Sequence, residues 1–357
     1  MKRFSPFLIL GALMVLLLAG CSDSGGPAPS AGSTPDYPTP EKPITLKLGY
    51  DPPPKEITDL AANEFKRLIE EETKGAVKIQ LYPQNQLGSM KAMMDGVLSG
   101  TIDMTGNPWN MLTTVMPEFN VMILPFNIDT IDLYWAVLGD EAFRKKINEL
   151  VNKKGLEFIG VPNGITRGLI TTSAVKMPSD LKGLKVRVMD GPIYTDMFTA
   201  WGATTSVISF AECYTGLQQG VIDSVDNDPG MGVLMKFFEV AKYYTPTNHI
   251  IHGCPIFINL GVWNKLSPEQ QAIMKSAGQR MEKFSADTYP EIDKVFWKRG
   301  SDEYGVTYID FDAETRKVWV DLSQPVYEKY RNVIGPDFYD WFIALVDAKR
   351  EELKKQD

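Results

Sequence analysis

Two arginines stand inside otherwise apolar segments of the chain. Residues 164–172 are predicted to form a strand with Arg167 near its start, and residues 181–188 another with Arg187 near its end. A guanidinium cannot be neutralised by losing its proton, so burying one without a partner is costly. A protein carboxylate is the ordinary partner, but neither segment carries Asp or Glu at a matching position. The pair therefore predicts an anionic ligand, bound through a bidentate guanidinium–carboxylate contact.

A short pattern occurs twice in the chain and is followed each time by a polar loop. Residues 95–103 and 215–223 share Gly, Gly, Ile and Asp at the same spacing, which is typical of a helix closed by glycine and followed by a short strand. Four residues after the Asp, each copy presents an asparagine, Asn107 in the first and Asn227 in the second. The repeat indicates two similarly built lobes, each offering a polar loop to a shared cleft.

Three nearby residues are better explained by structure than by chemistry. Phe210 is a lone aromatic residue before a helix, and such a residue usually belongs to the core. Glu212 and Asp226 fit the role of helix cap or ion-pair partner better than that of a catalytic acid. Spacing alone therefore assigns none of the three to a site.

Residues 249–254 hold His249, His252 and Cys254, three groups that could ligate a metal. In a strand, the odd spacing of the two histidines would place them on opposite faces, and no carboxylate or further cysteine joins them. We therefore expect no metal site. Cys213 and Cys254 could form a disulfide in an oxidising compartment or remain two buried thiols, and the sequence leaves both open.

The composition limits what the chain can do. Its 357 residues are enough for two lobes, and 37 Lys and Arg against 45 Asp and Glu give a net charge of −8, which argues against nucleic-acid binding. Two histidines and three cysteines leave few residues for catalysis. The sequence contains no nucleophile-elbow, phosphate-loop, zinc-protease or dinucleotide motif. We expect a protein that is not an enzyme and uses no cofactor.

The N-terminus carries an export signal followed by a tether. Two basic residues precede a short apolar run, and its Leu-Ala-Gly-Cys ending resembles a bacterial lipobox, which would make Cys21 the lipid-bearing first residue of the mature protein. In the next 22 residues, Gly, Pro, Ser and Thr make up 15, so the segment has too little apolar content to fold. We expect a signal peptide at residues 1–20, then the lipidated cysteine and flexible tether at residues 21–43. Without the signal peptide, the net charge is −10.

Strand and helix patterns alternate after the tether. Ile44–Tyr50 and Val77–Tyr82 have strand character, and apolar residues at helical spacing predict a helix over residues 57–69. This βαβα pattern predicts an α/β fold with a largely parallel sheet, in which ligands bind beyond the carboxyl ends of the strands. A capping box at Ser267 begins a helix of roughly 30 residues, long enough to run along both lobes. A strand at residues 306–309 and two more helices follow.

Three motifs occur in order in the second half of the chain: Pro178–Val188 (PSDLKGLKVRV), Trp201–Ala203 (WGA) and Glu212–Asp223 (ECYTGLQQGVID). Together they resemble the solute receptors of tripartite ATP-independent periplasmic (TRAP) transporters, in the C4-dicarboxylate-receptor branch. The earlier segments Pro83–Gly88 and Gly100–Met104 fit the same family. The resemblance covers essentially the whole chain after the tether.

The resemblance implies a two-lobed periplasmic-binding-protein fold with a ligand cleft between the lobes, crossed by interdomain strands and a long lobe-spanning helix. One lobe would comprise residues 44–164 and about 253–292, and the other residues 165–252 and about 293–357. The cleft would close around a small organic acid, and the receptor would hand this ligand to the membrane subunits of a TRAP permease.

The resemblance also assigns roles to individual residues. Arg187, the arginine of the LKGLKxRV motif, would form the salt bridge with the ligand carboxylate, and Arg167 would be the second arginine of the cleft. Asn227 would donate a hydrogen bond to the same carboxylate. Phe210 would pack on the ligand, in contrast to the core position that spacing alone favours.

Other positions match the family less closely. Asp226 stands where the family usually has Glu, and Ser224 stands where it usually has Gly, so the acidic character of this loop is kept. In the first lobe, Asp51, Asn107 and Trp109 fall in ligand-facing loops. With Asp226, these three residues complete the expected ligand-binding set.

These features together predict a monomeric receptor at the extracytoplasmic, or periplasmic, face of a membrane, anchored by lipid on Cys21. Two rivals stay open. One is an exported enzyme that acts on the same acids with His249 or His252 as a base. The other is the receptor of an ABC importer, which gives no reason for the LKGLKxRV motif. Dicarboxylates, sugar acids, keto acids and aromatic acids all fit an arginine-anchored cleft.

Overall fold

The computed structural model of the chain describes residues 36–355. The expected signal peptide, the lipid site Cys21 and most of the expected tether lie outside the described residues. Residues Tyr37–Asp357 group into one compact unit, and its fold is described by itself. None of the helices that the structure describes is both long enough and apolar enough to cross a membrane.

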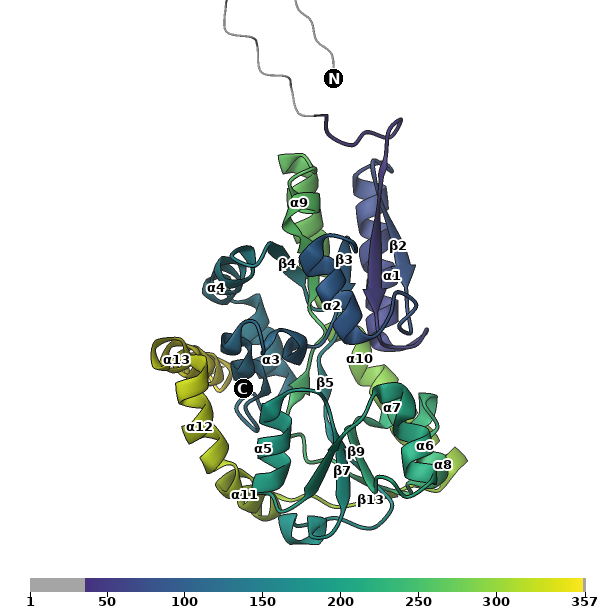
Figure 1. Cartoon of the computed structure of the whole chain (residues 1–357), viewed down its shortest axis with the longest axis vertical. Coiled ribbons are helices and arrows are strands. Elements are labelled where there is room, and N and C mark those ends of the chain that lie inside the picture. The colour runs from purple at the N-terminus through teal and green to yellow at the C-terminus, as the bar shows by residue number, and fades with distance from the viewer. Residues whose placement is uncertain (1–35, 356–357) are drawn as a thin grey trace, which may run out of the picture. The chain divides into compact units, whose positions relative to one another are not determined.

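The first sheet has five strands (Figure 1). Their order is β2 (Val77–Tyr82), β1 (Ile44–Tyr50), β3 (Met104–Gly106), β12 (Ile256–Asn259) and β4 (Leu156–Gly160). β1 runs parallel to β2 and β3, as the βαβα pattern predicts, whereas β12 runs antiparallel to β3 and β4. The sheet is mixed because β12 returns to it from far along the chain.

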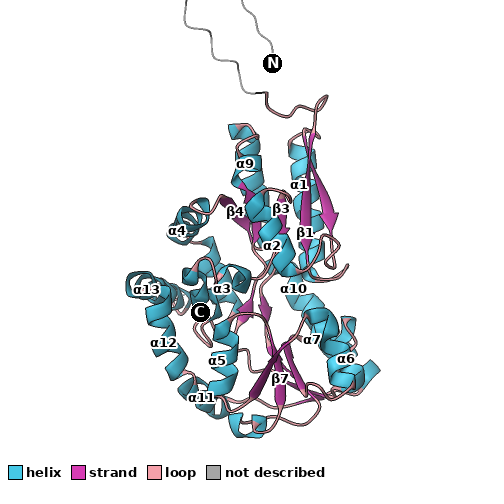
Figure 2. Cartoon of the chain, viewed as in Figure 1, coloured by secondary structure: helices cyan, strands magenta, loops and turns pink. Residues whose placement is uncertain are grey.

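The second sheet has six strands, drawn in magenta in Figure 2 below the first sheet. Their order is β13 (Thr307–Tyr308), β10 (Tyr243–Thr245), β6 (Gly168–Thr171), β9 (Ser224–Asn227), β7 (Lys185–Val188) and β8 (Thr204–Val207). β7 runs parallel to β8 and β9, and β6 runs antiparallel to β9 and β10. This central arrangement places Arg167 and Arg187 on either side of β9.

Helices pack against both sheets. The helices that contact the first sheet are α1 (Ile57–Glu72), α2 (Met90–Ser99), α4 (Glu141–Asn152) and α9 (Leu260–Trp263). Those grouped around the second sheet are α5 (Pro192–Ala200), α6 (Cys213–Gln218), α7 (Pro229–Leu234) and α8 (Phe237–Val240). We refer to the first sheet with its helices as the first lobe and to the second sheet with its helices as the second lobe.

Two features cross between the lobes. The short strands β5 (Ile165–Thr166) and β11 (Ile251–His252) pair antiparallel, and the helix α10 (Pro268–Tyr304) contacts α1 and β4 of the first lobe and α7 of the second (Figure 1). Ser267 caps α10 in the predicted capping box with Gln270. The helix has 37 residues and continues through Pro290, so it exceeds the predicted length.

Three helices, rather than the predicted two, end the described chain. They are α11 (Ala313–Leu322), α12 (Gln324–Ile334) and α13 (Pro336–Leu353). Two breaks separate them, at Ser323 and at Gly335, and the positive φ of 95° at Gly335 suits glycine. α12 packs on α5, and α13 packs on α3 (Ile131–Gly139), whose residues were expected in the first lobe. The residue boundaries of the two expected lobes stay a prediction.

The internal repeat is reproduced in hydrogen bonds. Gly100 and Gly220 each follow the end of a helix, and both glycines have a positive φ, of 78° and 69° respectively. The carboxylates of Asp103 and Asp223 each accept a hydrogen bond of 2.9 Å from the backbone N–H of a lysine in a strand of the same lobe, Lys47 in β1 and Lys185 in β7 respectively. The prediction of two similarly built units is therefore confirmed at this level.

Candidate functional site

A cavity lies at the carboxyl ends of strands from both lobes, where ligands of α/β sheets are expected. Its wall includes the loops after β1 and β3, the crossing strands β5 and β11, and the ends of β7 and β9. Five of the eight residues expected to bind a ligand line this wall: Arg187, Arg167, Asn227, Phe210 and Asp51. The structure thus brings together residues that are far apart in the sequence.

Arg187 is a buried cation without a protein carboxylate. Its side chain is 3% exposed, and its Nε donates to the backbone oxygen of Ile208 at 3.1 Å. Among residues 36–355, no Asp or Glu lies within ion-pair distance of it. Burial lowers its pKa, but a guanidinium remains protonated at neutral pH. The two terminal nitrogens of Arg187 are therefore free to hold an anion in the cavity.

Arg167 is equally buried, but the protein itself neutralises its charge. Its Nε lies 2.8 Å from Oδ1 of Asp226, and its Nη2 donates to the backbone oxygen of the same residue. The expectation that no protein carboxylate matches Arg167 was wrong, because the partner lies on the neighbouring strand β9, where Asp226 stands opposite Leu169. Arg167 also separates β5 from β6, so the single strand predicted over residues 164–172 is interrupted at this arginine.

Asp226 is the centre of a buried network. His249 approaches its Oδ1 with Nε2 at 3.4 Å, and Nδ1 of His249 lies 2.8 Å from Oγ1 of Thr247. Burial alone would raise the pKa of Asp226, but the charge of Arg167, with the neighbouring His249, holds it well below its usual range. Asp226 is fully buried and does not line the cavity, so it acts as the ion-pair partner that its sequence context also suggested.

The two asparagines of the repeat have different roles. Asn227 lines the cavity, and its Oδ1 accepts a hydrogen bond of 3.0 Å from the N–H of Asp228, which leaves its amide N–H groups for a ligand. Asn107 is fully buried and donates from Nδ2 to the backbone oxygen of Met90 at 3.0 Å. Its neighbour Pro108 reaches the cavity wall in its place.

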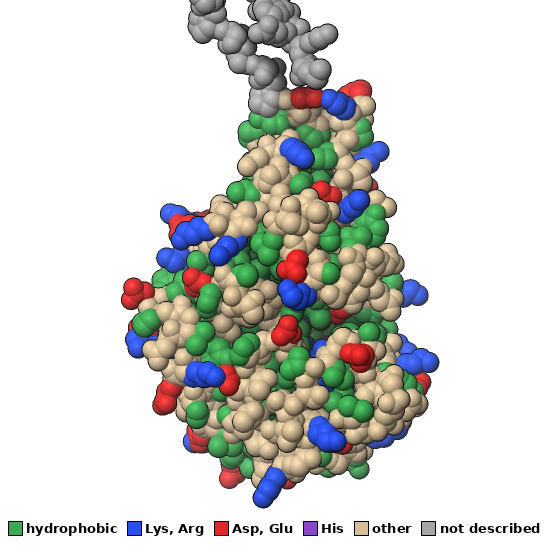
Figure 3. All heavy atoms as spheres, in the orientation of Figure 1, with side chains coloured by type: hydrophobic (Ala, Val, Ile, Leu, Met, Phe, Trp, Pro, Cys, Tyr) green, Lys and Arg blue, Asp and Glu red, His purple; other side chains and the backbone are tan. Residues whose placement is uncertain are grey.

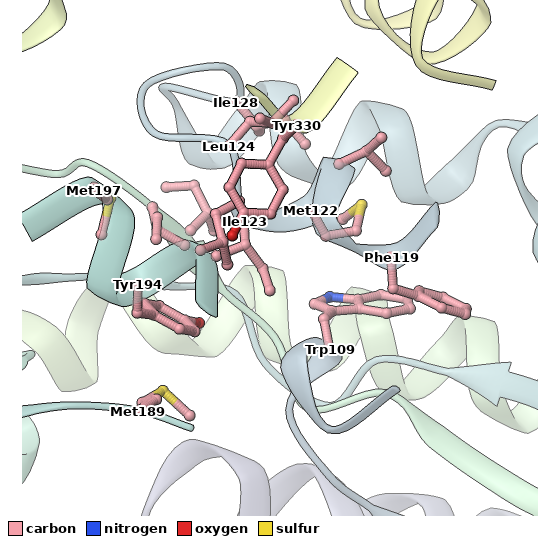
Figure 4. Packing of buried hydrophobic residues seen from close by; sticks show 14 of the residues in the cluster. Trp109, Phe119, Met122, Ile123, Leu124, Ile128, Met189, Tyr194, Met197 and Tyr330 are labelled. Atoms are coloured by element: carbon pink, nitrogen blue, oxygen red, sulfur yellow. The ribbon is translucent and has the colours of Figure 1, made fainter. Parts of the chain in front are cut away.

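Of the two aromatic residues expected to contact the ligand, only one lines the cavity. Phe210 lines the cavity with its ring 5.7 Å from Cζ of Arg187, and it packs edge-on against Phe237 at a centroid distance of 5.7 Å. It therefore belongs both to the core and to the site. Trp109 does not reach the cavity, because its ring stacks on Phe119 at 5.4 Å within the largest apolar cluster (Figure 4).

Asp51 faces Arg187 from the first lobe. Its Oδ1 accepts a hydrogen bond from the amide of Asn85. Burial raises the pKa of Asp51, while the Asn85 hydrogen bond and the charge of Arg187 act in the opposite direction. This is the electrostatic link between the two lobes across the cavity.

Three lining residues escaped the sequence reasoning, Glu56, Asp228 and Asn163, and two more, His252 and Cys254, were considered there only as metal ligands, a catalytic base or a thiol. Burial lowers the pKa of His252 to about 3, so its imidazole is neutral and has little affinity for a proton. Its Nε2 lies 3.5 Å from Sγ of Cys254, whose pKa burial raises. Cys213 and Cys254 are both free, buried thiols, which answers the disulfide question that the sequence left open. The part of the chain that the structure describes holds no group of three potential metal ligands.

A family model described as bacterial extracellular solute-binding protein, family 7, matches residues 48–332. The chain belongs to this family. The 2,3-diketo-L-gulonate-binding periplasmic protein of Escherichia coli K12 is 34% identical over 319 residues, covering 88% of this chain and 91% of that protein. The C4-dicarboxylate-binding periplasmic protein of Rhodobacter capsulatus is 25% identical over 312 residues, covering 87% of this chain and 92% of that protein.

Solved structures of this family share the fold. A TRAP periplasmic solute-binding protein of Pseudomonas putida F1 with bound D-glucuronate has a TM-score of 0.79 and 26% identity, covering 85% of this chain and 97% of that one. A second, from Haemophilus influenzae with bound L-gulonate, has a TM-score of 0.78 and 26% identity, covering 86% and 99%. This chain is thus a two-lobed, extracytoplasmic solute-binding receptor of the TRAP type, as the resemblance implied.

Proposed function

We propose that this receptor captures a small organic acid by holding its carboxylate on Arg187 and delivers it to a TRAP-type permease. The observation that carries the proposal is that Arg187 is buried in the cavity wall with both terminal nitrogens free and, among residues 36–355, with no carboxylate within ion-pair distance. A buried cation without a partner is unfavourable, and a ligand carboxylate accepts the bidentate pair of hydrogen bonds that a guanidinium offers.

Neighbouring groups complete this carboxylate site. Asn227 presents its amide N–H groups, and Phe210 covers the apolar face beside the guanidinium. Arg167 also lines the cavity, and its Nη1 makes no hydrogen bond within residues 36–355, so it can add a second contact to the ligand. Asp51 stands on the opposite lobe, where closure would bring it to the ligand.

The charges outside the cavity do not explain anion binding. Acidic and basic side chains are interspersed over the face drawn in Figure 3, and the whole chain is negatively charged. The selectivity must therefore come from the local field inside the cavity, where water and salt screen charges least. The relatives named above bind acids, according to their names or their bound ligands, which supports the same conclusion.

Titration calorimetry with a set of small organic acids tests the proposal. Arg187→Ala should lower the affinity for any acid that the wild type binds by at least 100-fold, since its buried carboxylate would lose its partner. Arg331→Ala is the matched control, because Arg331 forms an exposed pair with Asp340 away from the cavity. Unchanged affinity in Arg187→Ala would contradict the proposal.

The alternative that the protein is an exported enzyme predicts a different outcome for the same mixtures of protein and organic acid. Family members are receptors, and the neutral, buried His252 is a poor base. We expect mass spectrometry to recover each bound acid unchanged after long incubation with the protein. Conversion of an acid, lost in the variants His252→Gln or His249→Gln, would favour the exported enzyme.

We also propose that lipid on Cys21 anchors the receptor and that the folded unit works as a monomer. The lipobox-like ending and the Gly-, Pro- and Ser-rich tether support the anchor. Fractionation of cells that produce the full chain tests it. Wild-type protein should stay with the membranes, whereas Cys21→Ser should be released from them.

A further inference from the structure

The loop after β2 fixes the backbone of the loop after β1. Gln84 and Asn85 have positive φ values of 51° and 59°, a region that residues with a Cβ atom seldom occupy and that is enriched at functional sites. The N–H of Gln84 donates to the backbone oxygen of Pro52 at 3.1 Å. The N–H of Asn85 donates to the backbone oxygen of Tyr50, also at 3.1 Å. Asp51 lies between these two acceptors, so its backbone is held on both sides.

The side chain of Asn85 adds a third contact to the same place. Its Nδ2 donates a hydrogen bond to Oδ1 of Asp51. Burial raises the pKa of Asp51, and this hydrogen bond acts against the rise because it favours the ionised carboxylate. Asn85 therefore restrains Asp51 as an anion, and it does so with an amide that carries no charge of its own.

Arg187 is the natural partner of an anion at this position. Asp51 and Arg187 both line the ligand cavity, and both line a neighbouring groove whose wall also includes Asn85. Opposite charges attract strongly in such a poorly solvated space, and the charge of Arg187 lowers the pKa of Asp51. The two side chains nevertheless form no ion pair. Arg187 is tied to the backbone oxygen of Ile208 on its own side, and Asp51 is tied to Asn85 on the other.

We propose that Asn85 is a positioning residue that holds Asp51 away from Arg187 and so keeps the guanidinium open for the carboxylate of the ligand. The inference rests on the proposed function, because it takes Arg187 to be the carboxylate site. Without the restraint, Asp51 would occupy Arg187 as an anion of the same chain. Every ligand would then have to displace a competitor that is always present at high effective concentration.

The ligand-free protein tests the proposal before any ligand is identified. In the wild-type background, Arg187→Met removes a buried cation that has no carboxylate at ion-pair distance, so the thermal midpoint should rise by a few degrees. In the Asn85→Gly background, Asp51 has become the partner of Arg187. The same Arg187→Met change then leaves a buried carboxylate unpaired, and the midpoint should fall. A shift in the same direction in both backgrounds would overturn the inference.

The choice of variant separates the amide from the backbone. Glycine adopts the left-handed conformation freely, so Asn85→Gly keeps the turn and removes the hydrogen bond to Asp51. Asn85→Ala removes the same amide without adding backbone freedom, and it should give the same reversal. Lys74→Gly is the matched control, because Lys74 also has a positive φ, of 53°, and is exposed outside the walls of the cavity and the groove. It should keep the wild-type response to Arg187→Met.

Calorimetry measures the consequence for binding. The probes are D-glucuronate and L-gulonate, the acids bound in the two solved structures described above. Asn85→Gly should weaken the binding of either acid that the wild type binds by roughly ten-fold. The double variant Asn85→Gly, Asp51→Asn should bind within about three-fold of Asp51→Asn alone, because the internal competitor has lost its charge. If the loss persists in full in the double variant, Asn85 has a merely structural role and the inference is wrong.

Failure of this inference and failure of the proposed function give different results. If Arg187→Ala binds the acids like the wild type, the proposed function falls. If Arg187→Ala loses them while Arg187→Met shifts the midpoint in the same direction with and without Asn85, the carboxylate receptor stands and the positioning role falls. The reversal of the midpoint shift decides the matter alone if the wild type binds neither probe. Asn85→Ala replaces Asn85→Gly throughout if the glycine variant does not fold.

Discussion

Arg167 and Arg187 are the same residue type, equally buried and on opposite sides of β9 in one sheet, yet they have different partners. Each side chain is 3% exposed. Arg167 has Asp226 at 2.8 Å, and Asp226 has His249 behind it. Within residues 36–355, the side chain of Arg187 makes a single hydrogen bond, to the backbone oxygen of Ile208. Burial of a charge alone therefore does not single out a candidate binding residue; burial without a carboxylate at ion-pair distance is what supports Arg187 as one.

The largest expected effect comes from breaking the satisfied pair. Arg167→Ala leaves Asp226 buried beside His249 without its main counter-charge, and such a loss costs about 3–5 kcal/mol of the free energy of unfolding. Urea denaturation of the ligand-free protein measures it. Adding Asp226→Asn to Arg167→Ala should recover part of the loss, because the unpaired carboxylate is then gone. A loss below about 1 kcal/mol would mean that the network is not what stabilises this part of the sheet.

Replacing Arg187 should change the stability of the ligand-free protein in the opposite direction. Arg187→Met keeps most of the side-chain volume and removes a buried charge that has no carboxylate within ion-pair distance among residues 36–355, so the ligand-free protein should gain about 1 kcal/mol of stability. The ligand should then no longer stabilise it, whereas the wild type at 100 times the dissociation constant gains about 2.7 kcal/mol. Thermal unfolding with and without ligand measures both values. A large loss of stability in the ligand-free variant would contradict the contrast with Arg167.

The sequence predicted the local parts of the fold. β1, β2, α1 and the Ser267 cap of α10 follow from short-range patterns, and the repeated glycines and aspartates predicted two matching turns. The number of C-terminal helices and the interruption at Arg167 were missed. The interruption is set by packing across the second sheet, which a pattern along one segment does not contain.

The site was predictable only in part, for a similar reason. Arg187 was found because its charge contrasts with its apolar neighbours. The partner of Arg167 was missed because Asp226 lies 59 positions away in the sequence and meets it only when β6 and β9 pair. Glu56 was missed because a glutamate before a helix is an ordinary cap, and nothing along the chain shows that its second oxygen is buried without a partner.

The contrast between a paired and an unpaired buried charge also applies to an acid, because Glu56 lines the cavity and its Oε1 has no hydrogen-bond partner within residues 36–355. Burial, chiefly, raises its pKa from 4.5 to about 8, so its contribution to stability is fully present below about pH 4.5 and is lost as the pH rises through about 8. The stability of the ligand-free wild type should fall between pH 5 and pH 8, by on the order of 2 kcal/mol more than that of Glu56→Gln.

The quantity to measure is the difference in unfolding free energy between the wild type and Glu56→Gln, because Glu282 also loses its proton over this pH range and affects both proteins. Its pKa is about 7, raised by burial, and it is present in both. Denaturation curves at intervals of half a pH unit give the difference directly. Parallel stability profiles for the wild type and Glu56→Gln would show that Glu56 is solvated and not poised as the structure indicates.

The smallest changes in affinity and stability are expected from the two asparagines of the repeat. They offer the same contrast as the two arginines, one side chain facing the cavity and one bound within the protein, but with neutral groups. Asn227→Ala removes a donor that faces the cavity, and a net hydrogen bond of about 1 kcal/mol corresponds to a five- to ten-fold loss of affinity. Asn107→Ala leaves the backbone oxygen of Met90 unpaired and should lower stability by about 1 kcal/mol with unchanged affinity. Calorimetry and thermal unfolding of both variants separate the two roles. An equal loss of affinity in Asn107→Ala would show that the first-lobe asparagine also touches the ligand once the lobes close, and the repeat would then supply a matched pair of ligand contacts.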